Sequence, residues 1–134
     1  PQANRIPFKD LLTKADIVSL HCPLTKDTAG LISTEELGLM KDSAILINTA
    51  RGALVDEHAL KKALQERTIA GAATDVLSVE PPVDGNVLLD ESIPNLIITP
   101  HVAWIAHESR QRLVDQVAGN VEAFLEGKPR NQVF

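Results

Sequence analysis

Four short apolar runs in this sequence are each followed by side chains that can hydrogen-bond or titrate. Apolar runs without polar alternation are typical of buried strands in a parallel sheet. Because the carboxyl ends of parallel strands meet at one edge, open α/β sheets bind their ligands there. One polar residue in such a turn can have a purely structural reason, but all four segments together predict a ligand site. These segments are residues 21–25, residues 48–52, Asp75 and residues 100–101.

Three side chains have the chemistry to act on a ligand that contains a carboxylate. Arg51 lies between two small residues, and its guanidinium can hold a carboxylate through two parallel hydrogen bonds. The alternative, a solvated arginine at a helix start, is disfavoured because a positive charge there opposes the helix dipole. His101 follows a predicted strand and is the residue type that titrates near neutral pH. Glu80 precedes two prolines that stiffen its backbone, although taken alone it would be an ordinary loop carboxylate.

The other histidines and the single cysteine indicate less chemistry. Cys22 beside His21 suggests a thiolate nucleophile, but neighbouring residues of an extended chain point apart. His21, His58 and His107 lack the spacing of metal ligands. One cysteine can form neither an internal disulfide nor a cysteine-rich zinc site, so we expect no metal site.

The elements that must position these side chains are strands separated by helices. We expect strands at residues 17–20, 44–47, 69–74 and 96–99. We expect a first helix at residues 8–14 and a second that begins with a capping box at Ser33 and Glu36 and runs through Met40. A third helix should follow an N-cap at Asp56. A fourth should run from about residue 105 to 125 and end at Gly127. This pattern predicts an α/β fold with a parallel sheet covered on both faces.

Composition excludes several classes of protein. The 134 residues include 13 Lys and Arg against 18 Asp and Glu, for a formal net charge of −5. That balance argues against binding to a phosphate backbone, and 3% aromatic residues without tyrosine argue against a base-stacking platform. No apolar run approaches the ~20 residues of a membrane span. We therefore expect an acidic cytoplasmic protein that binds neither nucleic acid nor membranes.

The motifs at the ends of the predicted strands, in the order in which they follow one another along the chain, resemble those of the D-isomer-specific 2-hydroxyacid dehydrogenases. The matching segments are residues 15–25, 47–52, 75–82 and 99–101, while residues 101–112 look most like the glycerate dehydrogenase (hydroxypyruvate reductase) branch. The resemblance implies an oxidoreductase that transfers a hydride between a nicotinamide cofactor and a small D-2-hydroxy acid or 2-oxo acid, of the glycerate, hydroxypyruvate or glyoxylate type. It also implies a homodimer.

The resemblance assigns roles to particular residues. It implies a catalytic set of Arg51, Glu80 and His101, in which the imidazole exchanges a proton and the guanidinium holds the substrate carboxylate. It places Trp104 beside Arg51 and His101 in the substrate pocket, although packing of Trp104 in the core is an equal alternative. The residues implied to lie near the cofactor are Cys22, Pro23, Thr28, Thr49, Ala50, Arg51, Asp75, His101 and Ala103.

One family feature is missing from the sequence. No GxGxxG phosphate loop occurs, and in the family this loop lies upstream with most of the substrate domain. We therefore expect a C-terminal fragment that is inactive alone. Residues 1–102 would be the second half of a Rossmann-like doubly wound sheet, and residues 103–134 an interdomain helix and a tail. NAD is favoured over NADP. The alternative function is a non-catalytic nucleotide-sensing or partner-binding module with the same fold.

Overall fold

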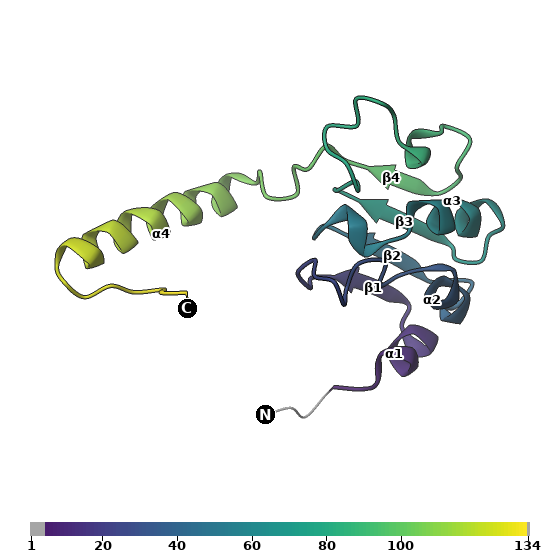
Figure 1. Ribbon diagram of the computed structural model, residues 1–134, viewed down its shortest axis with the longest axis horizontal. Helices are drawn as coiled ribbons and strands as arrows, with labels where there is room; N and C mark the ends of the chain where they lie inside the picture. Colours follow the sequence, from purple (N-terminus) through teal and green to yellow (C-terminus); the bar gives the residue numbers. More distant parts are fainter. Residues whose placement is uncertain (1–4, 134) are drawn as a thin grey trace. The chain divides into compact units, whose positions relative to one another are not determined.

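The structure is a computed structural model that describes residues 5–133. Contacts divide the chain after His101 into two compact units, which are described in turn. The first unit alternates helices and strands, as the sequence predicts (Figure 1). Its helices are α1 (Phe8–Lys14), α2 (Thr34–Leu39) and α3 (Glu57–Gln65), with short 3-10 helices η1 (Gly52–Leu54) and η2 (Val87–Leu89). Its strands are β1 (Ile17–Leu20), β2 (Ile45–Asn48), β3 (Gly71–Thr74) and β4 (Leu96–Ile98).

The four strands form one parallel sheet in the order β1-β2-β3-β4. At its carboxyl end the register places Leu20 beside Asn48, Asn48 beside Thr74, and Thr74 beside Ile98. The strand β1 has the predicted bounds, and the other three begin or end one or two residues from the predicted limits. The four segments expected to form the site therefore leave the sheet at the same edge.

Local signals in the sequence fix where the helices begin. Ser33 and Glu36 form the predicted capping box at the start of α2. Asp56 is the N-cap of α3, and its Oδ1 accepts a hydrogen bond of 3.0 Å from the Ala59 N–H. The predicted apolar face of α3, which includes Leu60 and Leu64, is buried. Each of these signals acts within four residues along the chain, and each prediction is confirmed.

The expectation that the sheet is covered on both faces is wrong for the described part of the chain. Val18 and Leu20 of β1 are buried in the core, whereas Ile17, Ile45 and Ile97 are 60%, 40% and 65% exposed. The helices α2 and α3 lie on one side of the sheet (Figure 1). The strands are added in one direction across the sheet, and right-handed crossovers then place the connecting helices on the same face. The core is therefore one layer between helices and sheet.

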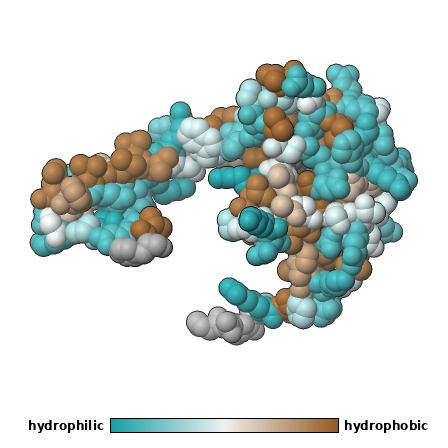
Figure 2. Space-filling model, viewed as in Figure 1, coloured by the Kyte–Doolittle hydropathy of each residue, from teal (hydrophilic) through white to brown (hydrophobic). Residues whose placement is uncertain are grey.

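The second unit consists mainly of α4 (His107–Leu125), which begins two residues later than predicted. The helix ends in a Schellman motif, because Gly127 has φ +72° and Lys128 N–H donates to the Ala123 carbonyl at 2.8 Å. Hydrophobic atoms run along α4 (Figure 2), where no side chain of the described helix is buried. The exposed apolar positions are Leu113, Val114, Val117, Val121, Phe124 and Leu125. No helix among the described residues is long and apolar enough to cross a membrane.

Candidate active site

Residues that follow the strands border several hollows in the first unit, and two of these hollows share Leu24 and Arg51. The larger hollow has a volume of about 700 Å³ and is lined by residues 21–24 and 49–51. The smaller hollow has a volume of about 250 Å³ and is lined by Leu24, residues 51–53, residues 76–78, Glu80 and His101. Arg51 and Leu24 line both hollows, so the two are neighbours at the carboxyl edge of the sheet.

The turn that presents Arg51 is held by the side chain of Asn48, the last residue of β2. Asn48 is only 3% exposed. Its Nδ2 donates to the Arg51 carbonyl at 3.0 Å, and its Oδ1 accepts from the Ala50 N–H at 3.1 Å. The Arg51 side chain is exposed, and its Nη1 donates to the Ala50 carbonyl at 2.6 Å. The guanidinium is therefore presented to solvent from a backbone that a buried amide fixes.

Gly52 allows the loop after β3 to lie against the turn that contains Arg51. A Cβ atom at position 52 would be 1.9 Å from the Leu77 carbonyl carbon and 2.3 Å from the Ser78 nitrogen. Only a residue without a side chain permits such close contact between two backbones. Because of this contact, residues 76–78 border the same hollow as Arg51.

Glu80 and His101 form a hydrogen-bonded pair at the smaller hollow. Glu80 Oε2 lies 2.8 Å from His101 Nδ1, and Glu80 Oε1 accepts a hydrogen bond of 2.8 Å from the Leu77 N–H. Burial raises the pKa of the Glu80 carboxyl, but the hydrogen bonds from Leu77 and His101 outweigh burial and hold the pKa below its usual value. The carboxylate is therefore ionised at neutral pH and able to orient the imidazole.

The backbone of His101 lies in an unusual conformation. Its φ of +56° is in the left-handed region, which is uncommon for residues other than glycine. The His101 N–H donates to the Thr99 carbonyl at 3.0 Å, and the Thr99 hydroxyl donates to the buried carboxylate of Asp75. Strain of this kind costs about 1–3 kcal/mol and is concentrated at functional sites. The contacts of Glu80 and Thr99 therefore hold His101 in a conformation that few residues other than glycine adopt.

The structure places most of the predicted cofactor residues at the larger hollow. Cys22, Pro23, Thr49, Ala50 and Arg51 line it directly. Cys22 is half-buried and packs against the core.

Thr28 and Asp75 line neither hollow. The Thr28 hydroxyl donates to the Pro23 carbonyl at 2.7 Å and accepts from the Thr25 N–H at 2.7 Å. Thr28 therefore shapes the loop that forms one wall of the larger hollow. Asp75 is 3% exposed and accepts the hydrogen bond from Thr99.

Ala103 and Trp104 belong to the second unit and are exposed in it. Trp104 is 55% exposed and is not among the buried core residues of the described chain. Among residues 5–133 no group of three or more His, Cys, Asp or Glu side chains could hold a metal ion.

Two residues that shape the site carry little signal in the sequence. Gly52 stands out there only as a small neighbour of Arg51, and Glu57 does not stand out at all. Glu57 accepts hydrogen bonds from Ser78 and Asn86, which are 21 and 29 residues away. The only sequence signal for Glu57 is an acidic residue in the first turn of a helix, which is common for electrostatic reasons alone.

This arrangement can bind a carboxylate and exchange a proton with the bound molecule. Arg51 and His101 border one hollow, and the ionised carboxylate of Glu80 lies at hydrogen-bond distance from one ring nitrogen of the imidazole. Comparison with known proteins identifies the family of the chain.

Residues 2–103 match the family model described as the NAD binding domain of D-isomer specific 2-hydroxyacid dehydrogenase. The chain belongs to this family.

Individual relatives agree with this assignment. The chain is 56% identical over 133 residues to glycerate dehydrogenase of Methylorubrum extorquens, covering 99% of this chain and 42% of the relative. The solved D-isomer specific 2-hydroxyacid dehydrogenase from Lactobacillus delbrueckii ssp. bulgaricus, in its NAD complexed form, is 40% identical with a TM-score of 0.82. That match covers 96% of this chain and 43% of the solved chain.

A third relative shows a different bound cofactor. The acyclic imino acid reductase Bsp5, solved in complex with NADPH and D-Arg, is 35% identical with a TM-score of 0.81. The match covers 96% of this chain and 40% of that chain. The chain therefore spans about two-fifths of the length of these dehydrogenases and reductases and has the fold of their NAD binding domain.

Proposed function

We propose that this chain supplies the catalytic side chains and part of the cofactor site of an NAD(P)-dependent D-2-hydroxyacid dehydrogenase. The enzyme transfers a hydride between a nicotinamide cofactor and a small 2-oxo or D-2-hydroxy acid of the glycerate, hydroxypyruvate or glyoxylate type. The observation that supports this most directly is the meeting of Arg51 with the Glu80–His101 pair at one hollow. The 56% identity to a glycerate dehydrogenase supports the substrate class.

The larger hollow fits part of a nicotinamide cofactor. Its volume of about 700 Å³ lies within the range of small-molecule sites, and Pro23, Thr49 and Ala50 line it with little side-chain bulk. When bound, the nicotinamide supplies or accepts the hydride. NAD is favoured over NADP, and the NAD complexed form of a relative with 40% identity supports that preference. Cys22, Pro23, Thr28, Thr49, Ala50, Arg51, Asp75, His101 and Ala103 are the residues proposed to lie near it.

The side chains of the smaller hollow act on the substrate. Arg51 holds the substrate carboxylate and polarises the neighbouring 2-oxo group. Because Glu80 holds Nδ1 of the imidazole, Nε2 of His101 is the nitrogen that gives a proton to the 2-oxo oxygen during reduction and takes it back during oxidation. Trp104 is proposed to line the same substrate pocket.

The chain fits a particular place in the longer enzyme. Residues 1–102 form the second half of the cofactor domain, and residues 103–134 form an interdomain helix and a tail. We propose that the chain by itself is inactive, because its sequence contains no GxGxxG phosphate loop and it spans about two-fifths of the length of its relatives. We further propose that the enzyme is a cytoplasmic homodimer, as the family resemblance implies.

Substitutions in the full-length protein test the catalytic assignment. With NADH or NADPH and a panel of 2-oxo acids, His101→Ala and Arg51→Ala should each lower kcat/KM at least about 100-fold, the effect of removing a general acid or a substrate clamp. His58→Ala is the matched control, because His58 is an exposed histidine on α3 that borders neither hollow. It should keep wild-type activity.

The outcomes of this experiment separate the two functions considered. Retained turnover in both the Arg51 and the His101 variants would overturn the catalytic roles. A wild-type protein that binds NADH, measured by fluorescence titration, yet reduces no 2-oxo acid would support the non-catalytic module instead. Comparing the NADH and NADPH titrations decides the cofactor preference.

A further inference from the structure

Glu57, the first residue of α3, directs its carboxylate to the loop that follows β3. Its Oε1 accepts a hydrogen bond of 2.7 Å from the Ser78 N–H, and its Oε2 accepts from the Ser78 hydroxyl at 2.7 Å. The Asn86 Nδ2 also donates to Oε2, at 2.8 Å. One half-buried carboxylate at a helix N-terminus therefore has three hydrogen-bond donors from a single loop.

These contacts fix the loop on both sides of Glu80. Ser78 lies two residues before Glu80, and Asn86 lies six residues after it. The Asn86 amide is itself oriented, because its Oδ1 accepts a hydrogen bond of 2.9 Å from the Leu88 N–H at the start of η2. Glu57 thus ties together the two ends of the segment that presents Glu80.

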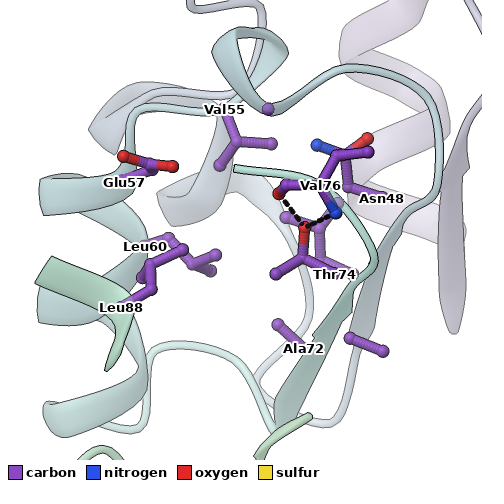
Figure 3. Close-up of a pocket in the computed structure, with 11 residues that line it drawn as sticks. Asn48, Val55, Glu57, Leu60, Ala72, Thr74, Val76 and Leu88 are labelled. Carbon is purple, nitrogen blue, oxygen red and sulfur yellow. Dashed lines mark hydrogen bonds between the residues drawn. The ribbon is translucent and has the colours of Figure 1, made fainter. Parts of the chain in front are cut away.

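The start of the loop is fixed by the end of β3. The Thr74 hydroxyl donates to the Val76 carbonyl at 2.6 Å and accepts from the Val76 N–H at 3.3 Å. Figure 3 shows these bonds on one side of a small cavity, with Glu57 on the α3 side. The cavity volume is only about 10 Å³, at the lower limit for a single water molecule, so Glu57 does not serve a ligand there.

A continuous series of contacts leads from Glu57 to the imidazole. Glu57 holds Ser78, the adjacent Leu77 N–H donates to Glu80 Oε1, and Glu80 Oε2 pairs with His101 Nδ1. We propose that Glu57 is a positioning residue that sets the place of Glu80, and through it the orientation of the His101 imidazole. This inference rests on the proposed dehydrogenase function and adds a residue that touches neither hydride donor nor substrate.

Glu57→Gln is the sharpest substitution, because it keeps the volume of the side chain. A carboxylate offers two acceptor oxygens to the three donors, whereas glutamine offers one oxygen and adds two donors of its own. The Ser78 N–H and the Asn86 amide then compete for one acceptor. We expect the loop to shift, and kcat of the full-length protein to fall about 10–100-fold, as for a small misplacement of a catalytic group. The KM for the cofactor should not change.

Asp56→Ala is the matched control. Asp56 caps the same helix one residue earlier, and its side-chain hydrogen bond goes to the Ala59 N–H within the helix rather than to the loop. This variant weakens the start of α3 but should leave kcat unchanged at a temperature where the protein is folded. A fall in kcat as large as that of Glu57→Gln would assign the effect to helix stability and overturn the proposal.

A double-mutant cycle gives a readout that a merely structural role would not produce. In a Glu80→Gln background, Glu57→Gln should cause no further loss of kcat, because the residue through which Glu57 acts is already disabled. If Glu57→Gln lowered kcat by the same factor in the wild-type and Glu80→Gln backgrounds, the proposal would be overturned. An unchanged kcat in the Glu57→Gln single variant would also overturn it.

Hydrogen–deuterium exchange of the full-length protein tests the same inference without activity. Glu57→Gln should speed exchange in residues 76–86, whereas Asp56→Ala should affect only the first turn of α3. Unchanged exchange in residues 76–86 would refute the proposal whether or not the enzyme reduces 2-oxo acids. If the wild type is active, His101→Ala is inactive and Glu57→Gln is normal, the inference about Glu57 fails while the proposed function stands.

Discussion

Replacing Gly52 with alanine tests whether the backbone contact beside Arg51 is essential. The added Cβ would lie 1.9 Å from the Leu77 carbonyl carbon, 2.1 Å from its oxygen and 2.3 Å from the Ser78 nitrogen. Non-bonded carbon atoms pack at about 3.5–4.0 Å, so the backbone at Leu77 and Ser78 must move by roughly 1.5 Å. No flexible side chain is available to absorb that movement, because all three obstructing atoms belong to the backbone.

A shift of this size breaks short hydrogen bonds. The Leu77 N–H bond to Glu80 and the Ser78 N–H bond to Glu57 are 2.8 and 2.7 Å long, and both donors would move with the displaced backbone. Overpacking costs about 1–3 kcal/mol, and loss of the hydrogen bonds brings the expected cost to the upper end of that range. In the full-length protein, kcat should fall at least about 10-fold, because Glu80 no longer orients His101.

Urea unfolding of Gly52→Ala, followed by circular dichroism, measures the stability change from the shift in midpoint at a common slope. The control is Gly38→Ala. Gly38 is exposed in α2, and a Cβ atom added there would meet nothing within 4 Å, so alanine should stabilise the helix by about 0.5–1 kcal/mol. If Gly52→Ala changed the stability by less than about 0.5 kcal/mol and kept wild-type kcat, the reasoning about this contact would be refuted.

Two further predictions concern stability. Asp56→Ala removes the hydrogen bond to the Ala59 N–H and should lower the free energy of unfolding by about 1 kcal/mol in urea titration, and no loss would contradict the N-cap role. Lys61 and Ser92 hold the pKa of Asp90 well below its usual value. The resulting stability is present above the unfolded pKa, about 3.9, and is lost progressively as pH falls from there through the lower folded pKa. Asp90→Asn should therefore be less stable than the wild type at pH 7, with a gap in urea midpoint that narrows toward pH 2; a constant gap would contradict the assignment.

The parts of the fold that could be predicted from sequence depend on contacts within a few residues. The capping box of Ser33 and Glu36 and the N-cap of Asp56 act over three residues, so their residue types are enough to place the helix starts. The strand β1 has the predicted bounds, and the four residues of this short run are followed directly by polar residues and a proline. The open face of the sheet could not be predicted, because apolar residues such as Ile17 do not tell which elements cover them.

The candidate site divides in the same way. Arg51 and His101 could be expected at one edge, because each directly follows a strand of a parallel sheet or its turn. Glu80 lies six residues beyond the end of β3, and only the family resemblance indicated its pairing with His101. The contacts that place Glu80, from Gly52 and Glu57, join segments more than 20 residues apart. No local pattern specifies such contacts, since they depend on how the turns lie in space.

The position of Arg51 relative to the Glu80–His101 pair depends on two features of one turn, an anchoring side chain and a missing one. The buried Asn48 amide closes hydrogen bonds onto the backbone at Ala50 and Arg51, which fixes the turn from the sheet side. Gly52 removes a side chain on the other side and lets the Glu80 loop approach. With a side chain at position 52, the turn would hold the Glu80 loop away from Arg51. Without the hydrogen bonds of Asn48, the turn would be mobile and the guanidinium would have no fixed position. In the proposed function, both features are needed for one carboxylate substrate to reach the guanidinium and the imidazole together.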